Sequence, residues 1–180
     1  RPRLGHGETE LEASGIDIVL AVDISGSMRA EDFKILGKYY NRLEVVKKVI
    51  KEFVEKREAD RIALIAFAGE PYLVSPLTLN HDWLNKNLER LEIGLISEEG
   101  TAIGSALIMS ANRLRDLQAK SKVVVLLTDG VNNSGSIQPV TAAEAAAALK
   151  VKVYTIAAGT KGKARVPVKD YLGRTRYQNI

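Results

Sequence analysis

The sequence GIDIVLAVDISGSM, residues 15–28, joins a strand-sized apolar run to an acid and two serines at alternate positions. Its nearly continuous apolar part is typical of a parallel strand that is covered on both faces. Asp23, Ser25 and Ser27 follow at the carboxyl end of this predicted strand. In sheets built from alternating strands and helices, ligands bind outside the carboxyl ends of the strands. The stretch therefore predicts a ligand site at one edge of a sheet.

The rest of the chain alternates between strand-like and helix-like segments, which predicts an α/β fold of the Rossmann-like, doubly wound kind with a mostly parallel sheet. Asn41 and Glu44 form a capping box at the start of the first helix. The link after residue 69 is short and Pro76 cannot donate to a ladder, so we expect one antiparallel edge strand. The expected strands cover residues 15–22, 61–69, 72–77, 122–128 and 151–159, and the expected helices begin at 41, 81, 101 and 139, with a loop over 29–40.

The length of 180 residues predicts one domain over residues 15–180, preceded by a peripheral arm over 1–14. Residues 160–180 form a basic extension, with a small hairpin expected around 170–173. The chain does not begin with methionine, and we expect it to be a fragment of a longer protein.

Composition excludes several classes of function. No apolar run approaches the roughly 18 residues of a membrane span. The sequence contains no cysteine, which excludes disulfides and thiolate metal sites. The net charge of +4 is small and lacks a basic stripe with interleaved aromatic residues, so we expect no nucleic-acid binding.

Two further segments reach the edge where residues 23–27 lie. The strand that ends in TDG, residues 128–130, should run parallel to the first strand and end beside it. The helix before that strand must then begin at the same edge, with Thr101 as its expected N-cap. Each pattern alone has an ordinary explanation as a loop, a cap or a turn. Together they place five oxygen-bearing side chains at one edge: Asp23, Ser25, Ser27, Thr101 and Asp129.

Oxygen ligands of this kind suit a hard divalent cation such as Mg²⁺. An extended DxSxS would place Asp23, Ser25 and Ser27 on one side, and Gly26 would permit a turn around the ion. Only two of the five ligands carry charge, and these short segments contain no basic residue. Such an ion would keep much of its electrophilicity and favour an anionic oxygen from outside the domain.

DISGSM, GTAIGSAL and LLTDG, in this order, resemble the three segments of the metal-ion-dependent adhesion site (MIDAS) of a von Willebrand factor type A (vWA) domain. By this resemblance Ser25, Ser27 and Thr101 would supply hydroxyl ligands, while Asp23 and Asp129 would act directly or through water. NRLEVVKKVI, IALIAFAG, SPLT and TDGVNNSG are similar to the bacterial Bat, or aerotolerance-operon, subgroup.

The resemblance implies a metal-binding protein–protein interaction domain and no enzyme. The cofactor would be Mg²⁺, with Mn²⁺ or Ca²⁺ as alternatives, and the partner would present Asp or Glu to the metal. Other Bat proteins and a MoxR-type AAA+ ATPase are the implied associates. Segments outside this chain would anchor the protein in a bacterial inner membrane, and the extracytoplasmic side is the expected one. The last strand and helix of the family's fold are not evident after residue 159, so we expect the domain to lack them.

The main alternative is a magnesium-dependent, phosphatase-like hydrolase with Asp23 as nucleophile. Such enzymes typically carry a second acid two residues later, where this chain has Ser25. A nucleotide-binding domain is disfavoured because neither GTAIGSA nor GTKGKA has the required glycine spacing. Tyr39 and Tyr40 could form a rim of the site or simply pack against neighbouring residues.

Overall fold

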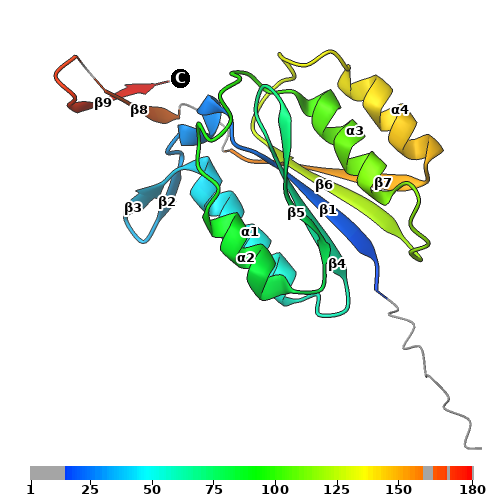
Figure 1. Cartoon of the computed structure of the whole chain (residues 1–180). Helices are drawn as coiled ribbons and strands as arrows, with labels where there is room; N and C mark the ends of the chain where they lie inside the picture. Colours follow the sequence, from blue (N-terminus) through cyan, green and yellow to red (C-terminus); the bar gives the residue numbers. More distant parts are fainter. Residues whose placement is uncertain (1–14, 160–163, 170, 180) are drawn as a thin grey trace, which may run out of the picture.

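A five-stranded sheet forms the centre of the computed structural model, which describes residues 15–159, 164–169 and 171–179. The strand order is β5-β4-β1-β6-β7, and β1 is the middle strand (Figure 1). The fold is therefore a mostly parallel sheet, as the alternation of segments predicts. The strands are β1 (Asp17–Asp23), β4 (Arg61–Phe67), β5 (Pro71–Thr78), β6 (Lys122–Thr128) and β7 (Val151–Ala157).

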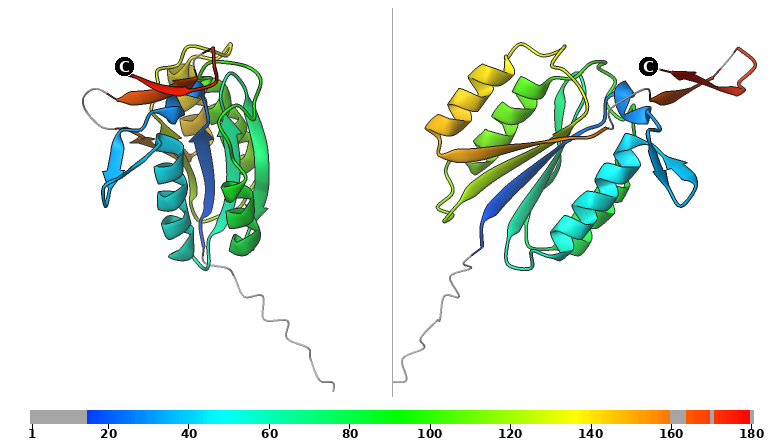
Figure 2. Two further views of the ribbon diagram at one scale, coloured as in Figure 1. Left: turned by 90° about the vertical axis from the view of Figure 1, so that its left-hand side faces the viewer. Right: turned by 180° about the vertical axis from the view of Figure 1, so that it is seen from behind.

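Helices cover both faces of the sheet (Figures 1 and 2). One core cluster lies between the sheet and α1 with α2, and the other lies beneath α3 and α4. All seven residues of β1 are buried, which explains its nearly continuous apolar sequence. The helices are α1 (Arg42–Glu55), α2 (His81–Glu89), α3 (Ile103–Leu114) and α4 (Pro139–Ala148).

The strand that contains Pro76 is the antiparallel edge strand. β5 pairs with β4 alone and runs antiparallel to it, whereas the other pairs of the sheet are parallel. An edge position tolerates proline because one side of the strand needs no ladder donor. This prediction is confirmed.

The capping box of α1 is also present. The Asn41 side chain accepts a hydrogen bond from the Glu44 amide at 2.8 Å, and the Glu44 carboxylate accepts one from the Asn41 amide at 2.8 Å. Two N–H groups at the helix start are thereby satisfied.

The expectation of a loop over residues 29–40 is wrong. A short 3₁₀ helix, η1 (Gly26–Arg29), is followed by a hairpin of β2 (Phe33–Ile35) and β3 (Lys38–Tyr40). Its turn places Leu36 and Gly37 at positive φ angles of 50° and 82°. Leucine is a poor residue for such a turn, where Asn-Gly is the usual signal, so residues 33–40 show no recognisable hairpin pattern.

A second hairpin follows β7, formed by β8 (Arg165–Lys169) and β9 (Thr175–Asn179). It agrees with the hairpin expected around residues 170–173, although Asp170 itself lies outside the described residues. No sixth strand joins the central sheet within the described part of the chain. The expected arm over residues 1–14 and most of GTKGKA lie outside that part. None of the helices described is long and apolar enough to cross a membrane.

Candidate functional site

Three of the five predicted ligands line one cavity beyond the carboxyl end of β1. The cavity has a volume of about 440 Å³, and Ser25, Ser27 and Thr101 are among its lining residues. Parallel pairing of β1 with β6 brings Asp23 and Thr128 to the same sheet edge. Asp23 and Asp129 do not line the cavity; they lie behind the serines and contact them through hydrogen bonds.

A chain of hydrogen bonds joins the serines to Asp129. Ser27 Oγ donates to Asp129 Oδ1 at 2.7 Å. Ser25 Oγ lies 3.0 Å from Ser27 Oγ. Because the Ser27 proton is engaged with Asp129, Ser25 is the donor in that pair. Residues 102 positions apart in the sequence thus form one cluster of oxygen atoms.

Asp23 is completely buried, and both of its carboxylate oxygens accept hydrogen bonds. Oδ1 accepts from the Ser25 amide at 2.8 Å, and Oδ2 accepts from Thr128 Oγ1 at 2.6 Å. Burial raises the pKa of Asp23 above its ordinary value, while the bonds from Thr128 and Ser25 oppose that rise and the nearby charge of Asp129 adds to it. The sequence pattern did not identify Thr128 as a partner of Asp23.

A basic residue also reaches the site from α1. Arg42 Nη1 donates to Asp129 Oδ2 at 2.5 Å, and the Nε and Nη2 atoms of Arg42 donate to Asp32 Oδ2 at 3.0 and 2.9 Å. The Arg42 side chain is 12% exposed, and both carboxylates are 1% exposed. The three segments of the site contain no arginine, but the fold supplies Arg42 from the first turn of α1. The lining of the cavity also includes the charged residues Arg29, Glu98 and Glu99.

Thr101 is placed at the site but is not the N-cap of α3. The cap position is Ala102, whose side chain caps nothing. The loop after β6 provides the missing cap: Asn132 Oδ1 accepts from the Gly104 amide in the first turn of α3 at 3.3 Å. The next residue, Asn133, accepts from the Thr101 amide just before the helix at 2.7 Å. The cap is thus supplied by a distant segment, which the expected local capping pattern could not reveal.

The glycines of the site have different roles. Ser27 already belongs to η1, so the DxSxS segment is not extended throughout. The Ser25 and Ser27 hydroxyls nevertheless lie on one side, as expected, 3.0 Å apart. A Cβ atom on Gly26 would meet nothing within 4 Å, which means that the turn does not require glycine there. Gly100 has a φ angle of +108°, and a Cβ atom on it would lie 2.8 Å from Ser134 Cβ. Gly100 therefore permits the loop before Thr101 to pack against the loop after β6.

The donor set is compatible with a hard cation that is held mainly by hydroxyl groups. No cluster of three or more His, Cys, Asp or Glu residues exists among the residues described, so soft or histidine-rich metal sites do not fit. Serine and threonine hydroxyls backed by two carboxylates are oxygen donors of the kind that Mg²⁺, Mn²⁺ and Ca²⁺ accept.

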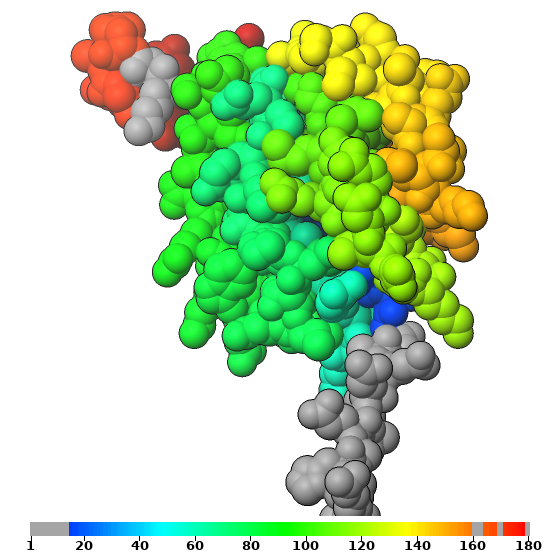
Figure 3. All heavy atoms as spheres, turned by 45° about the vertical axis from the view of Figure 1, so that its right-hand side comes forward, coloured from blue at the N-terminus to red at the C-terminus, as the bar shows by residue number. Residues whose placement is uncertain are grey.

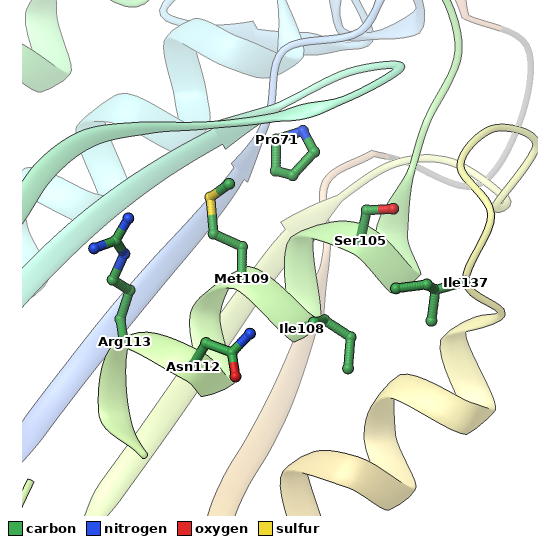
Figure 4. Close-up of a pocket in the computed structure, with 7 residues that line it drawn as sticks. All are labelled: Pro71, Ser105, Ile108, Met109, Asn112, Arg113 and Ile137. Carbon is green, nitrogen blue, oxygen red and sulfur yellow. The ribbon is translucent and has the colours of Figure 1, made fainter. Parts of the chain in front are cut away.

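A second hollow, between β5 and α3, lacks this chemistry. Its volume is also about 440 Å³. Figure 4 shows Ser105, Ile108, Met109, Asn112 and Arg113 along α3, with Pro71 on the β5 side and Ile137 beside the start of the helix. Its lining contains no carboxylate, and so it is not a candidate metal site.

The chain matches a known family of domains over most of its length. Residues 17–167 match the von Willebrand factor type A domain family. An uncharacterized protein of Borreliella burgdorferi is 36% identical over 162 residues, which are 90% of this chain and 46% of that protein. The chain spans about half the length of the curated relatives it matches.

Two solved structures are similar over most of the chain. An aerotolerance-related membrane protein of Bacteroides fragilis is 28% identical, with a TM-score of 0.77 over 92% of this chain and 82% of that one. BatB of Bacteroides thetaiotaomicron is 30% identical, with a TM-score of 0.77 over 92% of this chain and 80% of that one. The chain therefore belongs to the von Willebrand factor type A domain family, and its structural neighbours are Bat aerotolerance-related proteins.

Proposed function

We propose that this domain binds a divalent cation and, through it, an acidic residue of a partner protein, without catalysing a reaction. The observation that carries the proposal is the cluster of Ser25, Ser27 and Asp129 oxygens beside the cavity that Thr101 also lines. The ligands would be Asp23, Ser25, Ser27, Thr101 and Asp129, and the ion would be Mg²⁺, with Mn²⁺ or Ca²⁺ as alternatives.

The hydroxyl and carboxylate side chains would have different roles at the site. Ser25, Ser27 and Thr101 face the cavity and would provide neutral oxygen donors. Asp23 and Asp129 lie behind the serines, so they would orient the hydroxyls and supply negative charge. A cation bound to these residues would offer a coordination position to a carboxylate from outside, which forms a charge-assisted contact.

The contacts of Asp23 disfavour the hydrolase alternative. A nucleophilic carboxylate must reach the substrate, whereas Asp23 is buried and both of its oxygens are engaged by Ser25 and Thr128. His81 is no candidate base either, because its Nε2 atom lies 3.0 Å from the carbonyl of Asp60, next to the start of β4 and so at the opposite end of the sheet from the site.

The biological setting is proposed from the similar proteins. A structural neighbour is an aerotolerance-related membrane protein. We propose a bacterial inner-membrane complex in which the domain lies on the extracytoplasmic side and acts with other Bat proteins and a MoxR-type AAA+ ATPase. The proposed boundaries are an arm over residues 1–14 and a vWA domain over 15–180, with a basic extension over 160–180.

Titration calorimetry with MgCl₂, MnCl₂ and CaCl₂ tests the metal site. The unmodified chain should bind one ion, and Ser25→Ala and Thr101→Ala should remove the binding heat. Ser110→Ala is the matched control, because Ser110 is a buried serine whose hydroxyl donates to the Ala106 carbonyl within α3. Equal ion binding in all four proteins would reject the site.

A further inference from the structure

Two hairpins are joined beside the candidate metal site by a stacked arginine. The Arg165 guanidinium lies 3.9 Å from the ring centroid of Tyr39 on β3 and 4.1 Å from that of Tyr177 on β9. The Glu31 amide also donates to the Arg165 carbonyl at 2.8 Å, and the Glu31 carboxylate accepts from Arg165 at 3.1 Å. The Tyr39 contact runs between the two hairpins and is worth about 0.5–1 kcal/mol at an exposed site. The Tyr177 contact lies within the β8–β9 hairpin and holds the guanidinium in place. We call residues 33–40, 165–169 and 171–179 the hairpin platform.

The platform projects from the body of the domain. Figure 3 shows the β8–β9 hairpin standing out from the sheet and helices, and Figure 2 shows the β2–β3 hairpin near it at the same end of the molecule. Its side chains include fully exposed apolar ones, since Leu36 is 102% exposed and Tyr171 is 92% exposed. A projecting surface of this kind is available to a partner.

The platform carries the excess positive charge of the chain. By sequence, it contains six basic residues and no acid, whereas the whole chain has a net charge of +4. The remainder of the chain is therefore slightly acidic. The basic residues are Lys34, Lys38, Arg165, Lys169, Arg174 and Arg176.

Two of these basic residues, both on the β2–β3 hairpin, can attract negatively charged groups of a partner. Lys34 and Lys38 are exposed, and their amines lie over Tyr39 and Tyr40 at 5.4 and 5.1 Å from the ring centroids. Within the described residues, no carboxylate lies at ion-pair distance from either amine. The positive charges of the two amines are therefore not neutralised by a neighbouring carboxylate, which favours the attraction of a negatively charged partner.

The platform is connected directly to the candidate metal site. Asp32, immediately before β2, binds Arg42, and Arg42 binds Asp129. A polypeptide whose carboxylate reaches the cavity beside Asp129 would therefore have flanking residues close to the platform.

We propose that the hairpin platform binds an acidic segment of the same partner whose carboxylate the metal site receives. This inference rests on the proposed function, because the metal fixes one acid while the platform attracts the acids around it. Attraction between opposite charges of this kind increases association and weakens with salt. The partner segment should therefore carry several Asp or Glu residues rather than one.

Two fluorescent peptides test the proposal: a glycine–serine peptide with one glutamate, and the same peptide with four glutamates. Binding is measured by anisotropy in MgCl₂. The four-glutamate peptide should bind about tenfold more tightly, an advantage that disappears at 1 M salt, where the Debye length falls to about 3 Å. Lys34→Glu/Lys38→Glu should abolish the advantage. The control, Lys48→Glu/Lys86→Glu, changes the net charge equally on exposed helix positions and should retain it.

The outcomes separate this inference from the proposed function. Equal affinity for the two peptides, or no binding of the four-glutamate peptide, would overturn the platform while calorimetry with the metal alone still reports on the ion site. Tighter binding of the four-glutamate peptide that survives both EDTA and Thr101→Ala would support the platform and reject the metal-bridged contact.

A separate experiment uses vesicles made of equal parts phosphatidylglycerol and phosphatidylcholine to test for a lipid partner. If Lys34→Glu/Lys38→Glu abolishes sedimentation with these vesicles and the peptides bind alike, the surface belongs to a lipid partner and the proposal fails.

Discussion

Arg42 and Asp129 form a nearly buried ion pair in the candidate metal site, although 87 residues separate them in the sequence. The guanidinium binds Oδ2 of Asp129, while Oδ1 accepts from Ser27. Asp129, which should help to hold a metal cation, is thus already paired with the cationic side chain of Arg42. A second carboxylate, that of Asp32, binds the same guanidinium.

We predict that Arg42→Gln destabilises the metal-free domain and enlarges the stabilisation that Mg²⁺ produces. Removal of one partner from a buried ion pair costs about 3–5 kcal/mol, since the other charge remains buried. A divalent ion beside Asp129 would compensate for the lost positive charge, and it would no longer be repelled by the guanidinium. Urea unfolding with and without MgCl₂ measures both effects.

Arg61→Gln is the matched control for this experiment. Arg61 binds both oxygens of Asp17 at 2.7 Å, at the start of β1, the opposite end of that strand from the site. Arg61→Gln should leave the stabilisation that Mg²⁺ produces unchanged. If Arg42→Gln instead abolishes the magnesium effect, then Arg42 holds Asp129 in place for the ion and does not compete with it.

The sequence predicted the elements whose signals are local. The bounds of β6 agree because an apolar, β-branched run is flanked by Lys122 and by TDG. The capping box marked the start of α1 to within one residue. The hairpin of residues 33–40 was missed, because its turn is formed by Leu36 and Gly37 rather than by the usual turn residues.

The site was predicted only as far as strand direction determines it. Chain topology sufficed to place Asp23, Ser27 and Asp129 at one edge. The contacts of Arg42 and Asn133 were not predictable, because each depends on how a loop packs against a distant segment. Neither residue stands in a local pattern that distinguishes it from other residues of a helix start or a turn.

We predict that Thr128→Val destabilises the domain, since it removes the hydroxyl that donates to buried Asp23. An unsatisfied buried polar group costs about 1–3 kcal/mol. Thr155→Val, on the exposed part of β7, preserves shape in the same way and should change the free energy of unfolding little. Equal effects of the two substitutions in urea unfolding would contradict the role assigned to Thr128.

We predict that Asn133→Ala weakens metal binding as well as stability. Asn133 accepts from the Thr101 amide, and so it orients the residue that contributes a hydroxyl to the cavity. Loss of one side-chain hydrogen bond typically costs about 1 kcal/mol. Calorimetry should show a lower ion affinity than in Ser134→Ala, which removes only a 3.3 Å bond to the Gly69 carbonyl. Unchanged affinity in Asn133→Ala would mean that Thr101 is held by its other contacts.

An apolar groove beside β7 supports a prediction about polypeptide outside the described residues. The groove has a volume of about 510 Å³ and is lined largely by apolar side chains, including Phe53, Val125, Tyr154 and Ile156. Both Tyr154, which is 56% exposed, and Ile156, which is 45% exposed, belong to β7, the edge strand of the central sheet. By the resemblance to vWA domains, a further strand and helix would cover this face.

A longer polypeptide that continues past Ile180 should therefore have a larger free energy of unfolding. Burial of apolar surface contributes about 25 cal/mol per Å², so Tyr154→Ala should cost little in the 180-residue chain and clearly more in the longer one. Val140→Ala is the control: Val140 is 70% exposed on α4, on the other face of the sheet, and should be nearly neutral in both. If Tyr154→Ala has the same small effect in both polypeptides, the added segment does not cover the groove, and the visible elements already form the complete core.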